Sequence, residues 1–194
     1  MTKCVMLWVG AGDIGMAIAR RTGTGMKIII GDKILEKAKR TAGLMQGAGF
    51  DAVPMEMDLA SRASIQEYIS VGRAYGNISV LINAAGVSPS QAPIKTILNV
   101  DLYGTAVLLE EVGKVIADGG VGVTISSQSG HRLSALSPEE DELLACTPAE
   151  DLLTLDMLHP SRIRDTLHAY QLAKRCNVKR VMAESVRWGM RGAR

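Results

Sequence analysis

One stretch of the sequence decides the fold: CVMLWVGAGDIG, residues Cys4–Gly15. An apolar run of strand length leads directly into three glycines spaced GxGxxG, and residues with helical spacing follow in Ile14–Arg21. Glycine permits the tight turn and lets backbone N–H groups approach a pyrophosphate at a helix N-terminus. A glycine-rich turn without a ligand is the alternative, but the strand-turn-helix context favours a dinucleotide site. Asp13 is tolerated within this loop if its side chain points to solvent or caps the helix.

The rest of the chain repeats the alternation of strand and helix. Such alternation predicts right-handed βαβ units. We therefore expect an α/β protein with a doubly wound parallel sheet of the Rossmann type, in three layers (α/β/α), as a single domain over residues 1–194. The expected strands are Cys4–Val9, Lys27–Ile30, Ala52–Glu56, Val80–Asn83 and Val121–Ser126. The expected helices are Ile14–Arg21, Ile34–Gln46, Ser61–Arg73, Lys95–Ala117 and Ser161–Arg187.

Composition excludes several classes of protein. The 194 residues are 47% hydrophobic and 22% charged, with a net charge of +2, which argues against a disordered, fibrous or nucleic-acid-binding chain. No apolar run reaches the length of a membrane span, and the N-terminus leaves no room for a signal peptide, so we expect no membrane partner. Cys4, Cys146 and Cys176 match no zinc spacing and indicate reduced thiols in a cytoplasm.

Residues 133–161 interrupt the alternation and are strongly acidic. They contain seven acidic residues and no Lys or Arg, whereas Arg162–Arg194 is basic. We interpret both as solvated helix faces, because the basic part lacks the interleaved aromatic residues of a nucleic-acid patch. Ser137-Pro138 and Thr147-Pro148 each predict the start of a short helix. The segment is therefore expected to be a helical insertion and not a separate domain.

Asp32 ends the second expected strand, seventeen residues after Gly15. A carboxylate there would accept hydrogen bonds from the adenosine ribose and repel a 2′-phosphate, which favours NAD over NADP. The adjacent Lys33 could soften that preference. The alternative is that Asp32 only caps the helix that begins near Ile34.

Tyr170 and Lys174 stand four residues apart and so on one face of the last helix. A nearby cation favours a phenolate, which can exchange a proton with an alcohol or carbonyl oxygen. This pair is a weak pattern alone and can equally be a solvated helical pair. It gains specificity because Ser127 and the turn Asn83-Ala84-Ala85-Gly86 follow strands at the same edge of the sheet, where ligands bind.

The motifs follow one another in a set order: the glycine motif, Asp58 after the third strand, the NNAG-like turn, Ser127 after the fifth strand and the Tyr170/Lys174 pair. In this order the chain resembles the short-chain dehydrogenase/reductase family, and the resemblance runs from Val5 to the C-terminus. The resemblance implies that Ser127 hydrogen-bonds the substrate oxygen, with Ser126 or Ser129 as the fallback. It implies that Tyr170 transfers the proton, and that Lys174 holds the nicotinamide ribose and makes Tyr170 easier to ionise. Asp58 would contact adenine. The cofactor-binding residues so implied are Gly10, Gly12, Asp13, Ile14, Gly15, Asp32, Asp58, Leu59, Asn83, Ala84, Ala85, Gly86, Tyr170 and Lys174.

The chain departs from the family pattern in five ways, one of which is Ala84 as the second residue of the NNAG-like turn. Its glycine motif is one residue shorter, and Asp101 stands where the family has a catalytic Asn. The interval from Ser127 to Tyr170 is long, because residues 133–161 intervene; members acting on hydroxysteroids and related carbonyls can carry such an insertion. Family members also continue beyond the Tyr helix, so we expect a C-terminally truncated fold in which the fifth strand is an exposed edge.

These observations predict an NAD(P)-dependent oxidoreductase that interconverts a secondary alcohol and a ketone, with Ser127, Tyr170, Lys174 and Asp101 as catalytic residues. The resemblance implies a homodimer or homotetramer through its two long helices. The alternative is a non-catalytic dinucleotide-binding regulatory module on the same fold. A sugar-nucleotide epimerase with the same Tyr/Lys pair is disfavoured because the chain is short.

Overall fold

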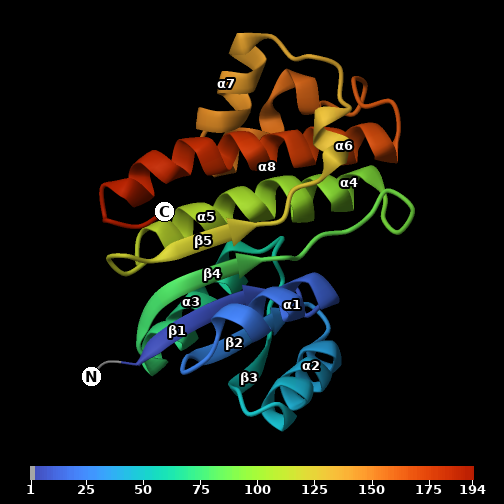
Figure 1. Ribbon diagram of the computed structural model, residues 1–194. Helices are drawn as coiled ribbons and strands as arrows, with labels where there is room; N and C mark the ends of the chain where they lie inside the picture. Colours follow the sequence, from blue (N-terminus) through green and yellow to red (C-terminus); the bar gives the residue numbers. More distant parts are fainter. Residues whose placement is uncertain (1–2) are drawn as a thin grey trace.

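Five parallel strands form one sheet in the order β3-β2-β1-β4-β5, with helices on both faces (Figure 1). This arrangement is seen in a computed structural model that describes residues 3–194. Met1 and Thr2 lie outside the described residues, and so does the start of the N-terminal segment in which the sequence predicts no signal peptide. The strands are β1 (Cys4–Val9), β2 (Lys27–Asp32), β3 (Asp51–Glu56), β4 (Asn77–Asn83) and β5 (Val121–Thr124). The helices are α1 (Asp13–Thr22), α2 (Leu35–Gly47), α3 (Arg62–Tyr75), α4 (Ile94–Ile97), η1 (Leu98–Gly104), α5 (Thr105–Gly113), α6 (Gln128–His131), α7 (Pro138–Cys146), η2 (Ala149–Thr154), η3 (Asp156–Leu158) and α8 (Thr166–Gly189).

The two faces of the sheet bury two separate apolar cores. Met6 and Trp8 of β1 pack with residues of α1 and α2, whereas Val5, Leu7 and Val9 point to the opposite face, toward α3, α5 and α8. Successive side chains of a strand alternate between faces, and here both faces are covered, which is why β1 is apolar throughout. The doubly wound parallel sheet predicted from the sequence is therefore confirmed.

The expected helix Lys95–Ala117 is wrong as a single regular element. The structure divides it into α4, a π-helical turn η1 and α5, which ends at Gly113. A π-helical turn holds an extra residue, and a 3.6-residue hydrophobic period cannot reveal it. The last helix begins at Thr166 instead of Ser161, because Asp165 caps it by accepting a hydrogen bond from the backbone N–H of His168 (2.7 Å).

The acidic segment 133–161 lies on the side of α8 that faces away from the sheet (Figure 1). Ser137 and Glu140 form a capping box at the start of α7, as the Ser-Pro pair predicts. After Thr147-Pro148 the chain forms the 3-10 helix η2 and not an α-helix. Asp141 joins α7 to α8 through Arg175 (2.6 Å) and Lys179 (2.7 Å), and the Arg175 hydrogen bond lowers the pKa of Asp141.

The edge of β5 is only partly exposed, which corrects the expectation of an open edge. After α8 the chain turns at Gly192, and Arg194 pairs with this edge: its N–H donates to Gly120 O (2.9 Å) and its carbonyl accepts from Gly122 N (2.7 Å). This is the hydrogen-bond pattern of a parallel bridge. Val123, one residue further along β5, remains 42% exposed. Across residues 3–194, no helix has both the length and the apolar character that a bilayer crossing requires.

Candidate functional site

The loop between β1 and α1 is shaped by three glycines that serve different purposes. Gly10 has a φ of 87°, and a Cβ there would lie 2.5 Å from Ala85 N. The absence of a side chain at Gly10 therefore lets the turn after β4 pack against this loop. A Cβ on Gly15 would meet the Trp8 indole at 2.0 Å, so this glycine allows α1 to pack on β1. A Cβ on Gly12 would meet no atom within 4 Å, because this position faces open space.

The N-terminus of α1 has free backbone donors beside Gly12. The first hydrogen bond of the helix runs from Met16 N to Gly12 O (3.0 Å), so the N–H groups of Asp13, Ile14 and Gly15 have no partner within the helix. The N-cap Gly12 supplies no side-chain acceptor, and the Asp13 side chain is exposed, as expected for a residue pointing to solvent. Such an array of donors suits an anionic phosphate group.

Asp32 lies at the end of β2 and is held by its surroundings. Its Oδ2 accepts from Ala11 N (2.9 Å) and pairs with Lys37 Nζ (3.1 Å), while Oδ1 accepts from Ile34 N (3.0 Å). The helix α2 has Ile34 as its N-cap residue, without a side-chain cap. Asp32 therefore supports the turn before α2 and does not occupy the N-cap position.

A cleft of about 410 Å³ runs along the carboxyl ends of β1, β2 and β4. Of the cofactor residues predicted from the sequence, eight line it: Gly10, Gly12, Asp32, Asp58, Leu59, Ala84, Ala85 and Gly86. Asp58 pairs with Lys33 (2.9 Å); burial raises its pKa, but the hydrogen bonds from Lys33 and from Ala60 N–H outweigh this and lower it overall. With free N–H donors at one wall and carboxylates at the other, these residues fit a dinucleotide.

Six of the predicted cofactor residues do not line this cleft: Asp13, Ile14, Gly15, Asn83, Tyr170 and Lys174. Gly15 packs against Trp8, and Ile14 and Asp13 are exposed on the first turn of α1. Asn83 is 1% exposed, and its amide donates to Thr105 Oγ1 (3.3 Å), which ties the end of β4 to α5.

Lys174, Asp101 and Tyr170 form a charged cluster where α8 crosses η1. Lys174 Nζ lies 3.6 Å from Asp101 Oδ2 and 5.3 Å from the centre of the Tyr170 ring. Asp101 is fully buried; its Oδ1 accepts from Val87 N (2.8 Å), and its Oδ2 has no hydrogen-bond partner among the described residues. Burial raises the pKa of Asp101, while the Lys174 charge and the Val87 N–H oppose the rise.

Gly86 connects this cluster to the cleft. It lines the cleft, and a Cβ on it would lie 3.2 Å from both Lys174 Nζ and Asp101 Oδ1. Lys174 therefore stands directly behind the cleft wall that Gly86 forms, and a side chain at this position would press on its ammonium group.

The serines after β5 have distinct partners. Ser126 Oγ donates to the carbonyl of Lys174 (2.8 Å), which fixes the end of β5 to α8. Ser127 is the N-cap of α6, and its Oγ accepts from Ser129 N (3.1 Å), so its own hydroxyl proton is not used by that bond. Gly130 lets α6 approach α8 closely, since a Cβ there would lie 2.8 Å from Arg175 N.

Sequence reasoning missed Asn177, which holds η1 in place. With its amide nitrogen facing the carbonyls, it donates to Asp101 O (2.8 Å) and Ala173 O (3.1 Å). Tyr170, Lys174 and Asn177 are spaced i, i+4, i+7 on α8, so three polar residues on one helix face were the available signal.

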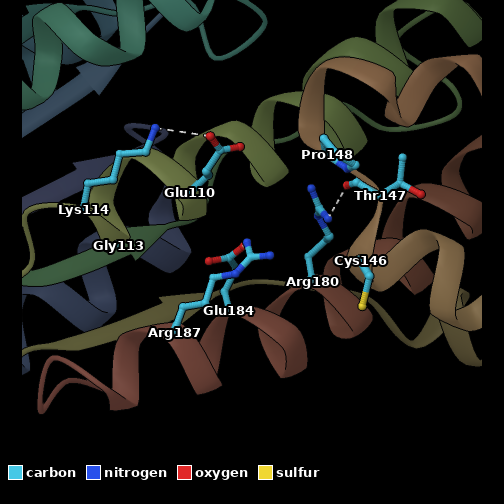
Figure 2. A pocket seen from close by; sticks show the side chains of 9 residues that line it. All are labelled: Glu110, Gly113, Lys114, Cys146, Thr147, Pro148, Arg180, Glu184 and Arg187. Atoms are coloured by element: carbon cyan, nitrogen blue, oxygen red, sulfur yellow. Dashed lines mark hydrogen bonds and ion pairs between the residues drawn. The ribbon is translucent and has the colours of Figure 1, made fainter.

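A second hollow of about 390 Å³ lies between α5, α8 and the end of α7, and Figure 2 shows the residues around it. Its charges pair with each other or with backbone: Lys114 with Glu110 (3.2 Å), Arg187 with Glu184 (2.6 Å), and Arg180 with the carbonyls of Ala145 (2.8 Å) and Thr147 (2.7 Å). None of the predicted site residues lines it. The Arg180 hydrogen bonds attach the acidic segment to α8, so we attribute a structural role to them.

The fold and the cleft together define a dinucleotide-binding protein of the doubly wound α/β class, in which Lys174 lies directly behind one wall of the cleft. The family model for short chain dehydrogenase matches residues 3–138. The short-chain dehydrogenase/reductase bsc3 of Alternaria brassicicola is 33% identical over 195 aligned residues, which cover 100% of this chain and 71% of that protein. The chain therefore belongs to the short-chain dehydrogenase family, an oxidoreductase family, as the sequence predicts.

Solved structures of low sequence identity share the fold. A short chain dehydrogenase from Burkholderia cenocepacia J2315 in complex with NADP has a TM-score of 0.72 at 19% identity, covering 98% of this chain and 70% of that one. A short chain dehydrogenase/reductase from Burkholderia phymatum in complex with NAD has a TM-score of 0.66 at 19% identity, covering 91% of this chain and 57% of that one. The neighbours thus include complexes with either dinucleotide.

Proposed function

We propose that the chain is an NAD(P)-dependent oxidoreductase that interconverts a secondary alcohol and a ketone. The observation that carries this proposal is the position of Gly86: one glycine lines the dinucleotide cleft and also abuts Lys174 and Asp101. A cofactor in the cleft would therefore lie next to the cluster of Tyr170, Lys174 and Asp101. NAD, when bound, would supply the hydride chemistry.

In this proposal each residue of the chain has one task. Tyr170 exchanges a proton with the substrate oxygen, and the Lys174 ammonium beneath its ring stabilises the phenolate and hydrogen-bonds the nicotinamide ribose. Ser127 donates its free hydroxyl proton to the same substrate oxygen, where negative charge develops. Asp101 is proposed as a positioning residue. Its carboxylate accepts a hydrogen bond from Val87 N and holds the Lys174 ammonium group in place behind the cleft wall.

We also propose a preference for NAD over NADP, because the Asp32 carboxylate lies at the cleft wall where a 2′-phosphate would bring further negative charge. We further propose, from the helical segment 133–161, that the substrate is a hydroxysteroid or a related carbonyl compound.

The proposed assembly is a homodimer or homotetramer through α5 and α8. Exposed apolar side chains on α8 and at its C-cap support it: Met182 is 60% exposed, Val186 67% and the C-cap residue Met190 79%. Sedimentation analysis of the purified chain tests the stoichiometry. We propose a cytoplasmic location because Cys4, Cys146 and Cys176 are free thiols.

The experiment compares Tyr170→Phe with the wild type, using NADH absorbance and a panel of secondary alcohols. We expect kcat to fall by at least about 100-fold, the usual loss for general acid–base catalysis, with NAD⁺ binding retained. Tyr75→Phe, at an exposed position on α3, is the control and should keep full activity. An active Tyr170→Phe enzyme would overturn the assignment. A wild type that binds NAD⁺ but oxidises or reduces nothing would favour the non-catalytic dinucleotide-binding module instead.

A further inference from the structure

Two ion pairs occupy the adenosine end of the cleft. Lys37 Nζ pairs with Asp32 Oδ2 (3.1 Å), and Lys33 Nζ pairs with Asp58 Oδ2 (2.9 Å). All four residues line the cleft. A ligand entering here therefore meets carboxylates whose charge is already matched by lysines.

The acceptor capacity of Asp32 is largely used. A carboxylate offers about four acceptor positions, and three are taken, by Ala11 N, Ile34 N and Lys37 Nζ. A ribose diol has two hydroxyl groups to donate. The two backbone donors belong to the loop and to the turn before α2, so Lys37 is the partner that can leave.

We propose that Lys37 is a specificity-determining residue for the dinucleotide, and this inference rests on the proposed function. Its ammonium competes with the ribose hydroxyls of NAD for Asp32. The same ammonium offers a counter-charge to a 2′-phosphomonoester. Lys37 thus weakens the binding of NAD and strengthens that of NADP, so that it narrows the preference that Asp32 creates.

Lys33 is less suited to this task. Its side chain is 70% exposed, and it pairs with Asp58 across the cleft. The Lys37 side chain is 40% exposed, and its partner Asp32 is only 10% exposed, so this pair is less screened by water. Lys37 also extends from the first turns of α2, where the helix limits its movement.

The test measures dissociation constants for NAD⁺ and NADP⁺ by calorimetric titration of the full chain, with no turnover required. Lys37→Met keeps the length of the side chain and removes its charge. We expect NAD⁺ to bind about fivefold more tightly, because an ion pair of this exposure is worth up to about 1 kcal/mol. We expect NADP⁺ to bind about tenfold more weakly, because a charge-assisted contact to phosphate is lost.

Lys39→Met is the matched control, since Lys39 is on the same helix and pairs with Glu36 outside the cleft. Lys37→Arg should keep both wild-type constants within about twofold, and Lys37→Gln replaces Lys37→Met if the latter does not fold. Unchanged constants in the neutral variants, or equal changes in Lys39→Met, would overturn the inference while the proposed function stands. A wild type that binds neither dinucleotide would overturn both.

Discussion

Alanine at Gly12 should weaken dinucleotide binding without harming the fold, whereas alanine at Gly10 should harm the fold itself. Gly12 has φ −101° and ψ 177°, a conformation open to any L-residue, and its Cβ would meet no atom within 4 Å. Gly10 has φ 87°, and its Cβ would lie 2.5 Å from backbone Ala85 N. The two neighbouring glycines therefore separate the requirement for folding from the requirement for binding.

The magnitudes follow from these contacts. Since Gly12→Ala adds no clash and reduces the freedom of the unfolded chain, we expect the free energy of unfolding to stay equal or rise by up to about 1 kcal/mol. Its methyl group would fill the space from which a phosphate reaches the N–H groups at the start of α1. Losing one such charge-assisted hydrogen bond costs about 1.5–3 kcal/mol, or a weakening of NAD⁺ binding by roughly 10- to 100-fold. Gly10→Ala should lose about 3 kcal/mol of stability, because a left-handed backbone and a clash combine.

Chemical denaturation and calorimetric NAD⁺ titration of the two variants provide the assay. Gly43→Ala is the control: Gly43 is exposed in α2, its Cβ would meet nothing, and the change should stabilise the chain by about 0.5–1 kcal/mol with binding unchanged. The reasoning fails if Gly12→Ala binds NAD⁺ as tightly as the wild type. It fails equally if Gly12→Ala unfolds as readily as Gly10→Ala.

Two further predictions concern a buried charge and the thiols. Burial raises the pKa of Asp101, so the folded state binds a proton more readily than the unfolded state, and the stability that Asp101 contributes is lost as pH rises above about 3.8. The Tm of the wild type minus that of Asp101→Asn should therefore fall as pH is raised from 4 to about 7; a difference that grows would contradict this. Burial raises the pKa of Cys176 to about 12, whereas Cys4 and Cys146 are exposed. A thiol reagent should therefore label two cysteines in the native chain and the third only after unfolding, and rapid labelling of Cys176 would refute its burial.

The sequence predicts backbone features of the site better than side-chain partnerships. The loop Gly10–Gly15 and the ends of β1 and β2 follow from an apolar run and glycine spacing, because these are local. The pairing of Asp32 with Lys37 depends on how α2 leaves the sheet, which no local pattern encodes. The bridge between Arg194 and β5 likewise joins residues far apart in the chain, after a turn only three residues long.

The contacts around η1 show why this π-helical turn was not predicted from the sequence. Residues Leu98–Gly104 read as an ordinary apolar helix, and its irregular turn exists because neighbours hold it there. Asn177 binds the Asp101 carbonyl, and Gly104 lets the segment approach Leu59, whose carbonyl would lie 2.3 Å from an added Cβ. Both contacts cross between elements, so they become visible only once the chain is folded.

These contacts explain how Asp101 can stand where the family resemblance leads us to expect Asn. Asn177 holds Asp101 through the main-chain carbonyl, which any residue supplies. Asp101 Oδ1 accepts a hydrogen bond from Val87 N, and the Oδ1 of an Asn side chain could accept the same bond. Neither tether therefore depends on the carboxylate, and the geometry of η1 should survive the exchange. What the exchange alters is charge: the second oxygen, Oδ2, is buried without a hydrogen bond and faces the Lys174 ammonium at 3.6 Å. In a site of low dielectric such a charge acts on the ammonium far more than a surface carboxylate would. The difference between Asp101 and the expected Asn is thus electrostatic, and we expect it to appear in the pH dependence of activity and not in the backbone geometry of η1.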